Sequence, residues 1–186
     1  MNTENNCRNK IFSASGIAKI AVFSAVGFLL SFLEFPIFPA APFLKLDFAN
    51  VTTLLGGFIL GPVPALIISA VKELLCLLKS STGGVGEIAN FILTASFVLL
   101  PSIVYRYKKG LKTVILSLAA ACMLQTAAGL IVNRFINFPL YMGEGAAAAF
   151  KSLWYYILFF NLIKSAAISA IVLLTYKRIS TLLSKF

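Results

Sequence analysis

A polar pair interrupts the most apolar part of the C-terminal half, where residues 156–165 read YILFFNLIKS. Asn161 and Lys164 are three positions apart, so in a helix their side chains share one face. Such side chains are costly in lipid, and within membrane spans they usually face the bundle interior and mark a pathway or a binding site. Counted from residue 153, Lys164 lies about 17 Å deep, too far to reach water easily. The segment predicts an internal polar site in a membrane protein.

The composition of the whole chain agrees with a membrane location. Of its 186 residues, 60% are hydrophobic and 12% are charged, whereas a soluble domain is nearer half apolar and a quarter charged. Residues 2–10 are polar and precede an apolar segment too long for a cleaved signal, so we expect no secretory signal. Histidine is absent from the sequence, and the three cysteines form no CxxC pair. We therefore expect no metal site and no disulfide framework.

The apolar segments predict six membrane-spanning helices in a single membrane domain, residues 1–186, so the expected fold class is an all-α integral membrane protein. The expected spans are residues 17–33, 49–60, 65–79, 88–105, 113–136 and 153–176. A span needs about 17–25 residues, so the second is too short to cross untilted. Prolines and glycines predict a tight turn at 61–64 and a loop at 137–145.

The basic residues predict the orientation of these spans. The formal net charge of +10 is concentrated in the polar N-terminal tail 1–12, the loop 106–112 and the basic C-terminal tail 177–186. Six spans place all three on one side of the membrane, and clustered Lys and Arg mark the cytoplasmic side. We expect a multi-pass protein with both termini in the cytoplasm. Its positive charge would set the orientation of the spans in the lipid membrane, and we expect no binding of nucleic acid.

The connector after the first span is unusual for a loop in water. Residues 34–48 read EFPIFPAAPFLKLDF, which is long, apolar and rich in proline and aromatic residues. We expect this outer connector to fold back over the mouth of the bundle as a lid. The alternative is an interfacial segment that rests on lipid headgroups.

Two further asparagines are expected at the level of the polar pair. Asn133 lies near the outer end of the fifth expected span, and Asn90 begins the fourth. An asparagine offers two donors and one acceptor, so these residues with Asn161 and Lys164 suit a neutral ring bearing carbonyl groups. Tyr141 is an aromatic candidate to stack on such a ring.

The simpler alternative makes the polar residues structural. Asn161 would tie two helices together, and Lys164 would pair with Glu73 or Glu87. Lys72 and Glu73 are adjacent, so we expect their side chains to point toward different surroundings.

Two small-residue motifs allow more than one interpretation. Residues 82–86 read TGGVG, which lacks the phosphate-loop pattern. This stretch is either a helix–helix turn or a site where backbone N–H groups bind a polyol or phosphate.

In the first span, Ala18, Ala21 and Ala25 form a stripe of small residues. Such a stripe allows close helix packing, either within the chain or against a partner protein.

Four stretches together resemble the substrate-binding (S) components of energy-coupling factor (ECF) vitamin transporters, specifically the riboflavin-specific type. They are FLKLDFANV (43–51), STGGVGEIANF (81–91), NRFINFPLY (133–141) and FFNLIK (159–164). The resemblance runs from the first helix over nearly the whole chain. It implies six helices, a location in the prokaryotic cytoplasmic membrane, and riboflavin bound near the outer surface under the connector.

The resemblance also implies residue roles and partners. The flavin ring edge would meet Asn133, Asn161 and Lys164, with the connector above and the 83–90 region near the ribityl chain. The implied ligand-binding set is Asn133, Asn161, Lys164, Asn90, Leu44, Lys45, Asp47, Thr82, Gly83, Gly84, Glu87 and Tyr141. Implied partners are a transmembrane coupling protein, docked on Ala18, Ala21 and Ala25, and two cytosolic ATPase subunits.

Three alternatives remain open at this point. The chain is an S component for another small vitamin or precursor, an intramembrane enzyme, or a purely structural membrane subunit. The lack of histidine and of a clustered acid/base or metal set disfavours the enzyme, so we expect no catalytic residues and no cofactor beyond riboflavin as the transported ligand.

Overall fold

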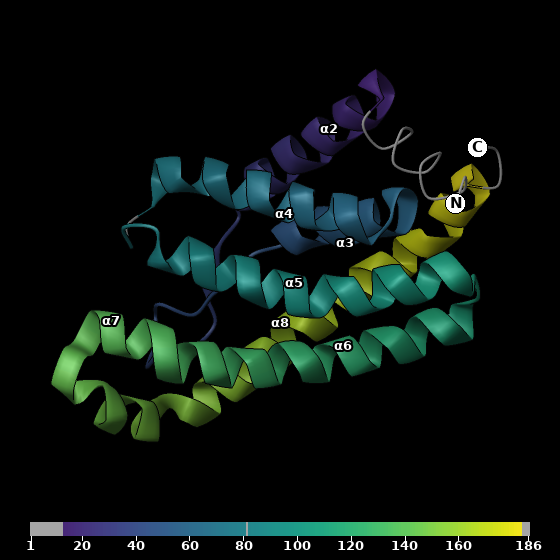
Figure 1. Ribbon diagram of the computed structural model, residues 1–186. Coiled ribbons are helices and arrows are strands. Elements are labelled where there is room, and N and C mark those ends of the chain that lie inside the picture. The colour runs from purple at the N-terminus through teal and green to yellow at the C-terminus, as the bar shows by residue number, and fades with distance from the viewer. Residues whose placement is uncertain (1–12, 81, 184–186) are drawn as a thin grey trace, which may run out of the picture.

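The computed structural model describes residues 13–80 and 82–183, and these are predominantly helical (Figure 1). In chain order the elements are α2 (Ala14–Leu30), β1 (Phe35–Pro36), β2 (Lys45–Leu46), α3 (Ala49–Leu60), α4 (Pro62–Cys76), η1 (Leu77–Lys79), α5 (Val85–Tyr107), α6 (Leu111–Val132), η2 (Asn133–Asn137), α7 (Phe138–Met142), η3 (Gly143–Gly145) and α8 (Ala146–Leu183). The expected N-terminal tail 1–12 lies outside the described residues, as do the last three positions of the expected C-terminal tail.

The short helix α3 lies at the centre of the bundle, where it contacts α2, α4, α5 and α8. Nine of its 12 residues are buried, including the polar Asn50, Thr52 and Thr53. Gly56 and Gly57 permit the close approach of its neighbours. A Cβ at Gly56 would lie 2.4 Å from Ile68 of α4, and a Cβ at Gly57 would lie 2.1 Å from the hydroxyl of Ser102 on α5. This helix is therefore a core element rather than a lipid-facing one.

The longer helices α5, α6 and α8 pack against one another around the same core. Phe97, Leu118 and Ile168, one from each helix, are buried together with Leu54 of α3. Two helical stretches, Val85–Tyr107 and Leu111–Thr175, are long and apolar enough to cross a membrane, and Ala14–Leu30 and Ala49–Leu60 are shorter apolar helices. The helical fold class is confirmed, whereas the count of six spans stays a prediction.

The predicted loop over 137–145 is wrong, because the chain stays helical from α6 to α8. A π-helical turn, η2, leads directly into α7 and then into the 3-10 turn η3. Pro139 lies in the first turn of α7, directly after the π-helical turn η2. Gly143, with φ of 52°, ends the helix. In this segment the proline and the glycine lie at the two ends of a short helix, so their presence is compatible with helical structure.

The predicted turn over 61–64 is confined to one residue. Gly61 has φ of 102°, a conformation that favours glycine, and Pro62 already begins α4. The fourth expected span, predicted to begin at residue 88, begins three residues earlier, at Val85.

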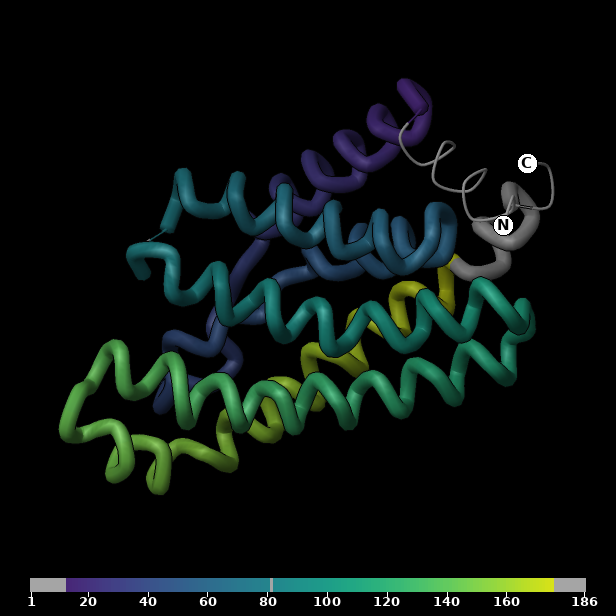
Figure 2. Tube along the Cα trace, in the orientation of Figure 1, coloured from purple at the N-terminus to yellow at the C-terminus, as the bar shows by residue number. Residues whose placement is uncertain are grey.

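The connector between α2 and α3 is folded onto protein. Its ends form a two-stranded antiparallel ladder in which Phe35 pairs with Leu46. Ala41, Leu44 and Leu46 are buried in a cluster with residues of α7 and α8, including Phe138. Figure 2 shows this segment reaching the end of the bundle near α7. The connector covers that end of the molecule, and its opening and closing as a lid stays a prediction.

Candidate functional site

A cavity of about 420 Å³ lies between the connector, the α4–α5 turn, η2, α7 and α8, within the size range of small-molecule sites. Ten of the twelve ligand residues expected from sequence line it: Asn133, Asn161, Lys164, Asn90, Leu44, Lys45, Asp47, Thr82, Glu87 and Tyr141. Gly83 and Gly84 do not line it. With φ values of 62° and 95° they shape the turn before α5.

An ion pair joins the connector to α8 at this cavity. The Lys164 ammonium lies 2.6 Å from Asp47 Oδ2, and the two side chains are 7% and 14% exposed. Asp47 Oδ1 accepts a hydrogen bond of 2.9 Å from the backbone N–H of Ala49 at the start of α3. Burial raises the pKa of Asp47, but the positive charges of Lys164 and Lys72 together with these hydrogen bonds hold the pKa below its usual value. Asp47 is therefore ionised and fixes the Lys164 ammonium in place.

The alternative partners expected for Lys164 were wrong. Glu73 pairs with Lys72, and Glu87 accepts a hydrogen bond from Thr82. Asp47 reaches Lys164 because the folded connector brings together residues 117 positions apart.

Two of the asparagines that line the cavity have buried amide oxygens without a partner among the described residues. The side-chain NH₂ groups of Asn161 and Asn133 each donate 2.8 Å bonds to carbonyls of their own helices, those of Ile157 and Gly129. Asn137 donates a 3.1 Å bond to Asn133 Oδ1. In the part of the chain that the structure describes, the Oδ1 atoms of Asn161 and Asn137 are buried without a partner. Buried acceptors are seldom left unpaired, so these atoms are suited to a ligand that donates.

Asn137 is a site residue that sequence reasoning missed. It lies four positions after Asn133, so a continuous helix places the two side chains near each other. Because a loop was predicted over 137–145, the sequence analysis gave no reason to place Asn137 near Asn133. The π-helical turn η2 holds both residues at the cavity, and such turns are frequent at functional sites.

Polar contacts also join residues that line the cavity to one another. The Tyr141 hydroxyl on α7 donates a 3.3 Å bond to the Thr82 carbonyl, and the Thr82 hydroxyl donates a 2.9 Å bond to Glu87. On the connector, the Lys45 ammonium lies 2.8 Å from a Glu34 carboxylate oxygen. Charges of both signs therefore line the cavity.

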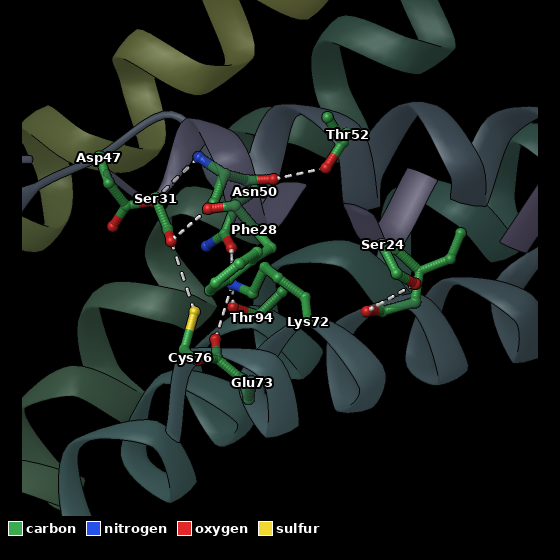
Figure 3. Close-up of polar contacts among 12 residues, drawn as sticks. Ser24, Phe28, Ser31, Asp47, Asn50, Thr52, Lys72, Glu73, Cys76 and Thr94 are labelled. Carbon is green, nitrogen blue, oxygen red and sulfur yellow. Dashed lines mark hydrogen bonds and ion pairs between the residues drawn. The ribbon is translucent and has the colours of Figure 1, made fainter. Parts of the chain in front are cut away.

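A second buried polar cluster lies beside Asp47 in the bundle (Figure 3). The Lys72 ammonium lies 2.6 Å from Glu73 Oε1 and donates a 3.1 Å bond to Asn50 Oδ1, which also accepts a 3.0 Å bond from the Thr94 hydroxyl. All four residues are buried. The expectation that adjacent Lys72 and Glu73 would face different surroundings is wrong, because α2, α3 and α5 all pack on α4 and the long lysine side chain turns toward the carboxylate.

The small residues of α2 divide into two faces. Gly16, Ser24 and Gly27 are buried against the bundle. Ala18, Ala21 and Ala25 are exposed on the other face, so this alanine stripe does not serve packing within the chain. Docking of a partner there stays a prediction.

A sequence model of the ECF transporter substrate-specific component matches residues 15–176. The chain belongs to this family. Among similar proteins, the riboflavin transporter RibU of Staphylococcus aureus (strain TCH60) is 37% identical, over 89% of this chain and 90% of that protein. The riboflavin transporter RibU of Streptococcus thermophilus (strain ATCC BAA-250 / LMG 18311) is 31% identical over 91% and 84% of the two chains. The resemblance drawn from the four stretches is thereby confirmed at the level of the S-component family.

A solved structure agrees with this membership. The S component of a bacterial ECF transporter superposes on this chain with a TM-score of 0.78 at 38% identity, covering 90% of this chain and 96% of the other. The fold is that of an S component, a membrane transport protein, and not that of a soluble domain with a similar helix content.

Proposed function

We propose that this S component binds riboflavin and is the substrate-binding subunit of an ATP-driven uptake transporter. The observation that carries the proposal is the Lys164 ammonium, fixed by Asp47, beside the unpaired amide oxygen of Asn161. The polar edge of a flavin ring alternates carbonyl acceptors with an N–H donor, and this pair of protein groups complements that alternation. Relatives named as riboflavin transporters support the same ligand.

The remaining cavity residues suit the other parts of the molecule. Leu44 of the connector would cover the flavin ring as part of a lid. Lys45, Thr82, Glu87 and Asn90, which also line the cavity, offer donors and acceptors for the hydroxyl groups of the ribityl chain.

The transport cycle requires a membrane arrangement and partners. We infer six membrane-spanning helices with both termini in the cytoplasm; the described start of α2 and end of α8 lie at one end of the molecule (Figure 1), which supports this. The exposed stripe of Ala18, Ala21 and Ala25 would dock a transmembrane coupling protein, whose two cytosolic ATPase subunits hydrolyse ATP. The S component itself catalyses no reaction and reorients to release the vitamin inside.

The test is an absorption spectrum of the detergent-purified protein, followed by titration with riboflavin while its fluorescence is recorded. A flavin band in stoichiometric amount, or saturable quenching, is the expected result. If neither is found, a screen of other vitamins decides between the alternatives. Saturable binding of a different vitamin would reassign the substrate, and the absence of any saturable ligand would favour a structural subunit.

A further inference from the structure

The charged side chains that line the ligand cavity balance one another. The described bases are Lys45, Lys79 and Lys164, and the described acids are Glu34, Asp47 and Glu87. Each of the three ammonium groups lies between 2.6 and 3.8 Å from a carboxylate oxygen. The buried cluster beside Asp47 is balanced too, because Lys72 pairs with Glu73 (Figure 3). A cavity whose charges cancel has no net attraction for an anion.

The pair of Lys164 and Asp47 is more enclosed than the other pair at the cavity. Its side chains are 7% and 14% exposed, whereas those of Lys45 and Glu34 are 47% and 35% exposed. Water and salt screen buried charges least, so this pair dominates the field where the proposal above places the polar edge of the ring. Among the described residues, Asp47 alone brings a carboxylate within 4 Å of the Lys164 ammonium. Loss of the Asp47 charge would therefore leave a buried cation uncompensated beside the ring.

The charge of a flavin depends on its oxidation state. The oxidised ring is neutral, and the uptake of two electrons and one proton gives a reduced ring that is largely an anion at neutral pH. The added negative charge lies on the same polar edge as the ring carbonyls, and a cation beside that edge stabilises the reduced form. Whether the site favours the oxidised or the reduced ring therefore depends on whether the charge of Lys164 is compensated.

We propose that Asp47 makes this site selective for the neutral, oxidised form of the vitamin, because its carboxylate cancels the charge of Lys164 beside the ring. Lys164 then donates a hydrogen bond to a ring carbonyl without attracting the anionic, reduced form. Asp47 thus determines specificity through Lys164 and needs no contact of its own with the ring. The inference rests on the proposed binding of riboflavin and adds to it the redox form that the site selects.

The test is the two-electron midpoint potential of riboflavin bound to the full-length protein in detergent, measured by anaerobic titration with dithionite at one neutral pH. For the unaltered protein we expect a potential at or below that of free riboflavin, which means that the oxidised form binds at least as tightly. Asp47→Asn should raise the potential of the bound flavin by ~30 mV or more, a tenfold change in the ratio of the two affinities. Glu144→Gln, which removes an exposed carboxylate outside the cavity, is the matched control and should leave the potential unchanged.

The sign of each shift separates an effect of charge from a disturbance of structure. Lys164→Gln leaves the Asp47 charge uncompensated and should lower the potential, and it decides the matter if Asp47→Asn does not fold. The double variant D47N/K164Q should return the potential toward that of the unaltered protein. Saturable riboflavin binding with equal potentials in all variants, or with shifts of one sign in both single variants, would overturn the inference and leave the proposed function standing. If the unaltered protein binds no flavin, the proposed function itself is wrong.

Discussion

Two buried lysines of this protein have the same chemistry and different surroundings. Each ammonium lies 2.6 Å from a carboxylate oxygen. Lys72 pairs with its neighbour Glu73 inside the bundle, whereas Lys164 pairs with Asp47 across the ligand cavity and far along the chain. The pair of Lys72 and Glu73 is enclosed by three helices and does not line the ligand cavity, so we expect it to act mainly on the stability of the fold. A pair at a cavity wall, with one member on a connector, is also available to a ligand.

The largest expected effect is on stability, from Lys72→Met. The substitution leaves the Glu73 carboxylate buried without its cation, which costs about 3–5 kcal/mol. Denaturant or thermal unfolding in detergent measures this loss. The riboflavin affinity of the protein that remains folded should change only slightly, because Lys72 does not line the ligand cavity.

A compensating variant sharpens this first prediction. Lys72→Met combined with Glu73→Leu removes both charges and should recover most of the lost stability. Lys151→Met, at an exposed position, is the control for removing a lysine. A loss for Lys72→Met no larger than that for Lys151→Met would mean that the enclosed pair contributes little.

The opposite pattern is expected for Lys164→Met. Riboflavin binding should weaken about a hundredfold, because a hydrogen bond from a charged group contributes about 1.5–3 kcal/mol. Stability should fall less than in Lys72→Met, since Asp47 retains some contact with water. Asn161→Ala should also weaken binding while the protein stays folded. Unchanged fluorescence titrations for both variants would contradict the site.

The two pairs also show what the sequence could predict. A lysine and an asparagine in an apolar segment are conspicuous, so the sequence alone predicts Asn161 and Lys164 as candidate site residues, and the structure places both at the cavity. Asp47 as the partner was not predicted, because it depends on how a proline-rich connector folds against α8. The pairing of Lys72 with Glu73 was not predicted. A helical wheel gives the direction in which each side chain leaves the helix, but it does not give the position of the ammonium group at the end of a flexible lysine side chain.

Local composition misled in one further place. Proline and glycine between residues 137 and 145 predicted a loop, although a proline in a first helical turn is compatible with a helix. The continuous helix places Asn137 beside Asn133. The predicted set of cavity residues therefore lacked Asn137, which lies beside Asn133.

A glycine offers a milder way to disturb the ligand site. A Cβ at Gly129 of α6 would lie 2.4 Å from the Nδ2 atom of Asn161, so Gly129→Ala should push that amide from its position. We expect riboflavin affinity to fall about tenfold, the loss of one neutral hydrogen bond of about 1 kcal/mol with some misplacement. Gly145→Ala, where the added methyl would meet no atom within 4 Å, is the matched control. Equal affinities for the two alanine variants would show that Asn161 does not need this space.

The smallest expected effect is the pH dependence of the Asp47–Lys164 pair. The pKa of Asp47 is lowered from 3.8 in the folded protein, so the pair stabilises the fold fully above that value and loses this contribution as the pH falls through the lower, folded pKa. The stability difference between the unaltered protein and Asp47→Asn should therefore be constant between about pH 7 and pH 5. It should shrink only in more acidic solution, below the usual pKa of an aspartate. Thermal unfolding of both proteins across this range measures the difference, and a decline already complete by about pH 5 would mean that Asp47 titrates as an unpaired buried carboxyl.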